Sequence, residues 1–140
     1  MMLKDKFGRD IHDLRISVTD RCNFSCVYCK SADPKNYFPH RELLDWEEFL
    51  RLSRILVGLG IREVRVTGGE PLLRTGVVDF VSRLRHIDGL EDVAITTNGY
   101  LLPEMAGDLA AAGCRFITRE LACGVCGEHG AARPGRQAGV

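Results

Sequence analysis

The sequence has 140 residues, of which 45% are hydrophobic and 27% charged, a composition typical of one globular unit rather than of a disordered or fibrous chain. Its 19 basic and 19 acidic residues balance, so no overall field attracts nucleic acid or anionic lipid, and an anionic ligand must be bound locally. The polar start MMLKDKFGRD is unlike a secretory signal, no long apolar run suggests a membrane span, and a cytoplasmic location is expected. Without export, six cysteines indicate metal or redox chemistry rather than disulfides.

The first predicted element is a strand from Leu14 to Val18, where the run LRISV is rich in branched side chains. It ends just before the first cysteine. The stretch that follows, to about residue 39, contains several turn-forming residues and little periodicity, which predicts a long connection. Connections of this length in compact proteins are usually functional.

A helix is predicted from Trp46 to Leu59, because Asp45 can cap its start and Glu48 stands three residues on, as in a capping box. Gly60 suits its end. Apolar residues recur at steps of three and four, and the stripe predicted to face a sheet is Phe49, Leu52, Leu56 and Leu59.

The remaining pattern alternates strands with helices. The predicted elements are a strand over Glu63–Val66, a tight turn over Thr67–Pro71, a helix with Val77, Phe80, Val81 and Leu84 on one face, a strand over Val93–Thr97 closed by Asn98-Gly99, a helix over Pro103–Ala112 and a strand over Arg115–Thr118. This βα rhythm predicts an α/β fold with parallel strands and right-handed crossovers. Ligands gather at the carboxyl ends of the strands in such sheets.

The composition changes after the last predicted strand. Residues 119–140 are rich in Gly, Ala and Arg and nearly lack branched apolar residues, so we expect a disordered, atypical tail after a core at residues 1–118. A tail of this kind is what a truncation or a shifted reading frame would produce.

Three cysteines have the spacing C-x3-C-x2-C in the segment CNFSCVYC: Cys22, Cys26 and Cys29. Thiolates are the usual ligands of iron–sulfur clusters, and three of them leave one iron of a cubane open to another ligand. A ferredoxin-type electron carrier would add a fourth cysteine before proline, and a zinc site would more often pair two C-x2-C knuckles. The pattern therefore favours a [4Fe–4S] cluster with one open iron.

The segment CNFSCVYC, placed after a first strand, resembles the signature of the radical S-adenosylmethionine (SAM) superfamily. The stretches LRISVTDRC at 14–22, VRVTGGEPLLR at 64–74 and TTNGY at 96–100 are similar to the GTP 3′,8-cyclase family of molybdenum cofactor biosynthesis. The likeness covers about residues 5–117. It implies an incomplete (β/α)6-type partial TIM barrel of which this chain is the N-terminal part.

The resemblance also implies the chemistry. The cluster binds SAM, one electron cleaves SAM to a 5′-deoxyadenosyl radical, and that radical starts the conversion of GTP into a cyclic pyranopterin, a lyase reaction. It implies an electron donor such as flavodoxin or ferredoxin and a possible homodimer, with no nucleic acid or membrane partner.

Site residues follow from the matching positions. SAM is assigned to Tyr28, Gly68, Gly69 and Glu70, with Glu70 and Pro71 fixing the turn that lets backbone groups approach SAM. GTP is assigned to Arg15, Arg65 and Thr96, since arginine grips phosphate oxygens bidentately. The alternatives are packing under the loop for Tyr28, solvated strand charges for the arginines, and a plain strand residue for Thr96.

Other features depart from the family pattern. Glu120 stands where the family has a SAM-binding serine, and the family's later units with their second cluster are not matched. Cys123 and Cys126 are interpreted as incidental and Cys114 as a small apolar filler. The alternatives that stay open are radical SAM chemistry on a peptide or haem substrate, and an inactive cluster-binding remnant.

Overall fold

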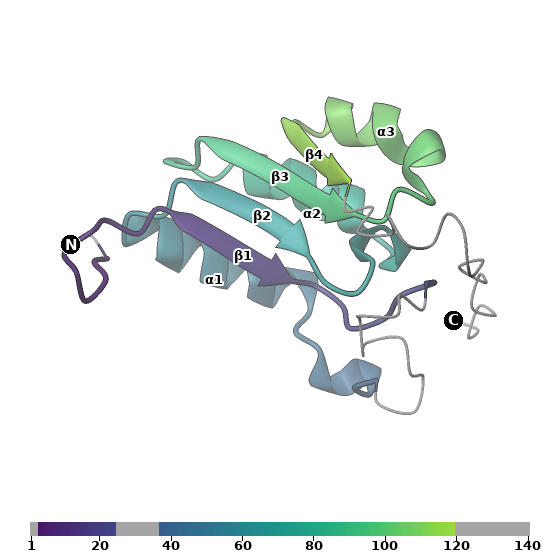
Figure 1. The fold of residues 1–140 in the computed structure, drawn as a ribbon, viewed down its shortest axis with the longest axis horizontal. Helices are drawn as coiled ribbons and strands as arrows, with labels where there is room; N and C mark the ends of the chain where they lie inside the picture. Colours follow the sequence, from purple (N-terminus) through teal and green to yellow (C-terminus); the bar gives the residue numbers. More distant parts are fainter. Residues whose placement is uncertain (1–2, 25–36, 120–140) are drawn as a thin grey trace.

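The computed structural model describes residues 3–24 and 37–119. Four parallel strands form one sheet in the order β1-β2-β3-β4 (Figure 1). The strands are β1 (Asp13–Ser17), β2 (Glu63–Thr67), β3 (Asp92–Thr97) and β4 (Phe116–Arg119); the helices are α1 (Trp46–Gly58), α2 (Val77–Arg85) and α3 (Leu102–Ala111), with short 3-10 turns η3 (His40–Glu42) and η4 (Pro71–Leu73).

The predicted α/β fold with parallel strands and alternating helices is confirmed. The bounds predicted for the four strands and for the first and third helices agree with the structure to within one residue at each end. Arg119, the first residue of the predicted tail at 119–140, instead ends β4. Tyr28, Cys26, Cys29 and residues 120–140 of that tail lie outside the described residues.

The sheet has two chemically different faces because side chains alternate along each strand. One face carries the core, and its buried members include Ile16, Val64, Val66, Val93 and Ile95. Figure 1 shows α1 and α2 behind the sheet on this side, and α2 also packs against α3. Burial of these branched side chains against the helices is the main source of stability, at about 25 cal/mol per Å² of apolar surface.

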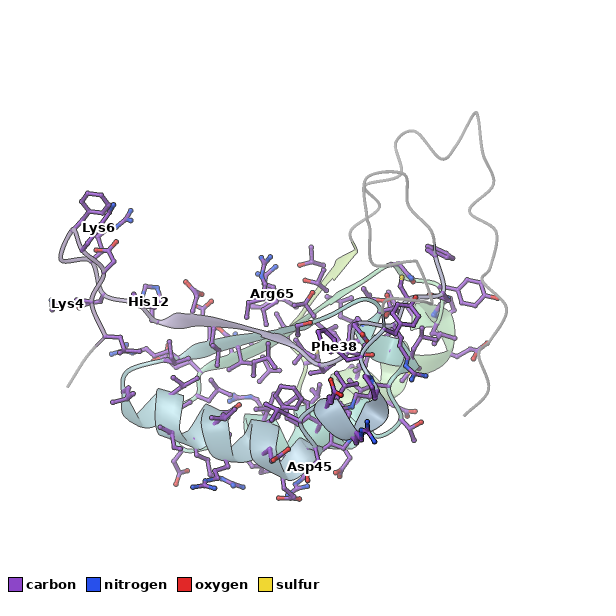
Figure 2. All side chains as sticks on the ribbon, turned by 90° about the horizontal axis from the view of Figure 1, so that it is seen from below. Lys4, Lys6, His12, Phe38, Asp45 and Arg65 are labelled. Carbon is purple, nitrogen blue, oxygen red and sulfur yellow. The ribbon has the colours of Figure 1, made fainter. Side chains whose placement is uncertain are left out.

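The opposite face is polar and is covered by no helix in the described ranges. Arg15 of β1 is in register with Arg65 of β2, and Thr96 of β3 is in register with Thr118 of β4. Figure 2 shows Arg65 projecting from the side of the sheet away from α1. We call this the open face.

Helix α1 begins as predicted, with a capping box. The Asp45 carboxylate accepts the Glu48 N–H at 2.8 Å, and the Glu48 carboxylate accepts the Asp45 N–H at 2.8 Å. These bonds satisfy N–H groups that the first helical turn leaves without intrahelical partners.

The buried stripe of α1 differs from the prediction. Leu52 is 45% exposed, whereas Leu50 and Ser53 are fully buried beside Phe49. Ser53 can occupy a core position because its hydroxyl donates to the Phe49 carbonyl at 2.8 Å. The prediction of Leu52 as sheet-facing was wrong because apolar periodicity does not register a buried serine that satisfies its own hydroxyl.

No helix in the described part of the chain is both long enough and apolar enough to cross a lipid bilayer.

The burial of Leu50 and the exposure of Leu52 give a matched test on helix α1. Leu50→Ala is expected to lower the free energy of unfolding by about 2–5 kcal/mol, because it leaves a cavity in the core. Leu52→Ala makes the same chemical change two residues away on the exposed side and is expected to cost under about 1 kcal/mol. Urea unfolding followed by circular dichroism measures both. Equal losses would contradict the observed helix orientation.

Candidate functional site

Three segments meet at the carboxyl edge of the sheet: the residues after β1 that lead into the first cysteine, the Gly68–Glu70 turn after β2, and Asn98 after β3. The Gly69 N–H donates to the Thr19 carbonyl at 2.6 Å, and the Glu70 N–H donates to the Arg21 carbonyl at 2.7 Å. These bonds extend the β1–β2 pairing beyond the strands. The turn after β2 therefore docks directly on the backbone that carries Cys22.

The two glycines of this turn are required by that docking. A Cβ atom at Gly68 would overlap the Thr19 carbonyl oxygen, and one at Gly69 would overlap the Arg21 carbonyl oxygen and lie 2.7 Å from that of Asp20. No larger residue fits without moving backbone. Close approach of the cysteine-bearing segment thus explains both glycines, independently of any SAM contact.

The carboxylate of Glu70 is fully buried and is the centre of a hydrogen-bond network. It accepts the Leu72 N–H at 3.1 Å, the Thr97 hydroxyl at 2.7 Å and the Asn98 N–H at 2.7 Å. Its negative charge is stabilised by these donors, as a buried charge must be. Glu70 fixes the turn after β2 and ties it to the end of β3.

The sulfur of Cys22 lies among N–H donors. Its Sγ accepts the Phe24 N–H at 3.4 Å and lies 3.9 Å from the Asn98 side-chain nitrogen. The Tyr37 hydroxyl lies 3.5 Å from the Cys22 nitrogen and 3.4 Å from its carbonyl oxygen. An environment of donors suits a thiolate that ligates iron, so the surroundings of Cys22 fit the ligand role predicted for it.

Of the three motif cysteines, the structure describes Cys22 alone. Within residues 3–24 and 37–119 no three His, Cys, Asp or Glu side chains gather as a metal site. Cys26, Cys29 and the SAM candidate Tyr28 remain predictions from the sequence.

The substrate candidates Arg15, Arg65 and Thr96 all lie on the open face. The Arg65 guanidinium is half-buried and donates to the Thr118 hydroxyl at 3.2 Å, whereas Arg15 is exposed. A concave region of about 450 Å³ lies over the starts of the strands, and both arginines line it. The structure thus brings the two arginines together on adjacent strands, beside the strand that carries Thr96.

Charge is segregated along this face. Two residues before Arg15 and Arg65 on the same face lie Asp13 and Glu63, which are in register with each other. Asp92 of β3 is in register with Glu63. The hydrogen bond that a protonated Glu63 donates to the Asp13 carboxylate, together with burial and the negative charges of Asp13 and Asp92, raises the pKa of Glu63. Asp92 is paired with Arg115 at 2.9 Å. The acidic row that repels anions from the strand starts is therefore Asp13 and Glu63, and the face favours anions at the arginines and towards the carboxyl edge.

Two residues that hold this site together, Arg74 and Asn98, were assigned no role from the sequence. Arg74 donates to the Val18 carbonyl at 2.5 Å and the Leu44 carbonyl at 2.7 Å, with its guanidinium 4.1 Å from the Trp46 ring centre. It secures the end of β1 just before the cysteine segment. Asn98 was predicted only to close the strand over Val93–Thr97, whereas its side-chain nitrogen lies 3.9 Å from Cys22 Sγ. The motif VRVTGGEPLLR contains Arg74, but the long-range partners of both residues are not visible in a sequence.

A family model described as the Radical SAM superfamily matches residues 16–119. Because this match covers most of the 140 residues, the chain belongs to the radical SAM superfamily. Membership implies SAM and an iron–sulfur cluster as cofactors.

Within the superfamily, the chain is similar to proteins named GTP 3′,8-cyclase. It is 57% identical over 109 residues to that of Heliobacterium modesticaldum, covering 78% of this chain and 33% of the relative. It is 50% identical over 121 residues to that of Geobacter sulfurreducens, covering 86% and 37%. The chain therefore spans about a third of the length of these relatives.

A solved structure of BtrN in complex with AdoMet and 2-DOIA has a similar fold. The TM-score is 0.59 at 23% identity, over 76% of this chain and 44% of that one. This likeness supports the α/β arrangement.

The close packing of Gly69 against the Arg21 carbonyl predicts that one added methyl group destabilises the fold. Gly69→Ala is expected to lower the free energy of unfolding by about 1–3 kcal/mol or more, since the new Cβ overlaps backbone atoms. Gly107→Ala in α3 meets no atom within 4 Å and is expected to be neutral or stabilising by up to about 1 kcal/mol. Urea unfolding compares them. A Gly69→Ala variant as stable as the parent would contradict the docking.

Proposed function

We propose that this chain is the N-terminal part of a radical SAM GTP 3′,8-cyclase, a lyase that forms the cyclic pyranopterin precursor of molybdenum cofactor. The observation that carries the proposal is the in-register pair Arg15 and Arg65 on the open face of the sheet whose carboxyl edge holds Cys22. Identities of 45–57% to proteins named GTP 3′,8-cyclase support it.

The cofactor half of the site would use Cys22, Cys26 and Cys29 to hold a [4Fe–4S] cluster. A cluster of this kind, with SAM bound, supplies one-electron cleavage of SAM to a 5′-deoxyadenosyl radical. The chain's own contribution is positional: the Gly68–Glu70 turn sets where the cysteine segment lies and offers backbone atoms beside it to SAM. Tyr28 is the proposed contact to the SAM adenine.

Within that turn, Glu70 has a supporting role. Its carboxylate already accepts three protein donors, from Leu72, Thr97 and Asn98. This arrangement supports a residue that holds the turn in place, with SAM contacted by the glycine backbone.

The substrate half would use Arg15, Arg65 and Thr96. A guanidinium presents five N–H donors in a planar fork that matches phosphate oxygens. The bond to Thr118 engages one N–H of Arg65 and orients the rest of its fork. A GTP molecule on the open face would thus have its anionic groups held by the arginine pair and kept away from the acidic row at Asp13 and Glu63.

The same assignment extends to partners and compartment. We propose an electron donor such as flavodoxin or ferredoxin, a homodimer in the full-length family, and a cytoplasmic location.

Cluster assembly is the first test of this function. Anaerobic reconstitution with iron and sulfide, followed by dithionite and SAM, is expected to give a brown protein that produces 5′-deoxyadenosine. Cys22→Ala is expected to lose cluster iron and product together, because a ligand is gone.

Cys114→Ala is the matched control. Cys114 precedes β4 at the opposite end of the strands, and burial raises the pKa of its thiol, which makes it a poor metal ligand. It is expected to retain iron and activity. A colourless parent chain, or equal iron in both variants, would refute the cluster assignment; iron without 5′-deoxyadenosine would indicate a cluster-binding remnant.

GTP binding is the second test. Arg65→Ala is expected to weaken GTP binding by about 10- to 100-fold, the loss of one charge-assisted contact of about 1.5–3 kcal/mol. Arg62→Ala removes an equal charge at an exposed position whose guanidinium lies 3.4 Å from Glu91 and is expected to bind as the parent does. Isothermal titration calorimetry measures both. SAM cleavage without GTP binding would favour a different radical SAM substrate.

A further inference from the structure

We propose that Asn98 is a positioning residue whose side-chain amide donates to the Cys22 sulfur and thereby holds the first cluster ligand and raises the reduction potential of the cluster. The inference rests on the proposed cluster function and goes beyond it, because Asn98 is neither a ligand nor an assigned cofactor or substrate contact. The side-chain nitrogen lies 3.9 Å from Cys22 Sγ and 2.8 Å from the Asn23 side-chain oxygen.

The orientation of the Asn98 amide is fixed by its neighbours. The Tyr100 N–H donates to Asn98 Oδ1 at 2.9 Å, so that atom must be the oxygen and the other must be the NH2 group. The NH2 group is therefore directed at Asn23 and Cys22. It has two N–H bonds and meets two acceptors.

The backbone of Asn98 is held by a separate contact. Its N–H donates to the buried Glu70 carboxylate at 2.7 Å, and the Thr97 hydroxyl donates to the same carboxylate. The Asn98 side chain is thus anchored from behind by a group with no exposed surface. Anchoring lowers the entropy cost of its contact with the cysteine segment.

Asn98 links the end of β3 to the cysteine-bearing segment by side-chain hydrogen bonds, and the Phe24 ring also meets the Tyr100 ring edge-on at 5.8 Å. The turn after β2 holds that segment by its backbone, at Thr19 and Arg21. Asn98 holds it one and two residues further on, at Cys22 and at Asn23. A thiolate that accepts a hydrogen bond has less negative charge to place on iron, so a cluster with this bond is easier to reduce.

The test compares two charge-matched variants in the reconstituted full chain. In Asn98→Asp the carboxylate still accepts the Tyr100 N–H but has lost the donor to Cys22. In Asn23→Asp the same charge is added beside the same sulfur, and the acceptor for the Asn98 amide is kept. The midpoint potential is measured by redox titration followed by electron paramagnetic resonance.

We expect Asn98→Asp to lower the midpoint potential of the cluster more than Asn23→Asp does. We also expect a chelator to remove iron faster from Asn98→Asp than from Asn23→Asp. Equal shifts, or a larger shift in Asn23→Asp, would mean that charge alone acts and would overturn the proposal. If Asn98→Asp does not fold, Asn98→Ala against Asn23→Ala makes the same comparison, because Asn23→Ala retains the donor to sulfur.

A measurement on the chain without cluster separates this inference from the proposed function. Hydrogen exchange of the peptide spanning residues 19–24 is expected to be faster in Asn98→Asp than in Asn23→Asp, because the segment loses the hydrogen bonds that the Asn98 amide donates to it. Unchanged exchange in Asn98→Asp would overturn the positioning role even where the cluster forms. Faster exchange in a chain that binds no iron would uphold the link while refuting the cluster.

Discussion

The backbone contact between the turn after β2 and the segment after β1 governs the geometry of this site. Gly69 and Glu70 donate to the Thr19 and Arg21 carbonyls, and only glycine leaves room for those carbonyls to approach. The carboxylate of Glu70 then ties this turn to the end of β3, because it accepts the Thr97 hydroxyl and the Asn98 N–H. Three strand ends are locked together by short-range contacts, so the first cysteine has a defined place before any cofactor arrives, which is the preorganisation that a reactive site needs.

The sheet divides its two tasks between its faces. The helix side buries branched side chains such as Val66 and Ile95 completely and supplies the stability that holds the strand ends in register. The open face carries charge instead, with Arg15 and Arg65 next to each other and an acidic row nearer the strand starts. Because the acidic row opposes anions at one end, the electrostatic preference of the face runs towards the edge that bears Cys22.

Much of this arrangement could be predicted from the sequence. Strand and helix positions followed from periodicity, and the capping box at Asp45 and Glu48 formed as local rules require. Leu52 was misplaced because a self-satisfied Ser53 occupies the core position. The roles of Glu70 and Asn98 depend on partners that lie far away in the chain, and no local pattern encodes such pairings. The glycines were recognised, but their contact with the Thr19–Arg21 backbone became evident only in three dimensions.

The site proposed at this sheet edge is a cluster with one iron open to SAM. Mössbauer spectroscopy of the chain reconstituted with 57Fe, recorded with and without SAM, tests it most directly. We expect a [4Fe–4S] spectrum in which one iron site changes when SAM is added while the other sites stay the same. A spectrum that SAM leaves unaltered, or one without cluster iron, would contradict it.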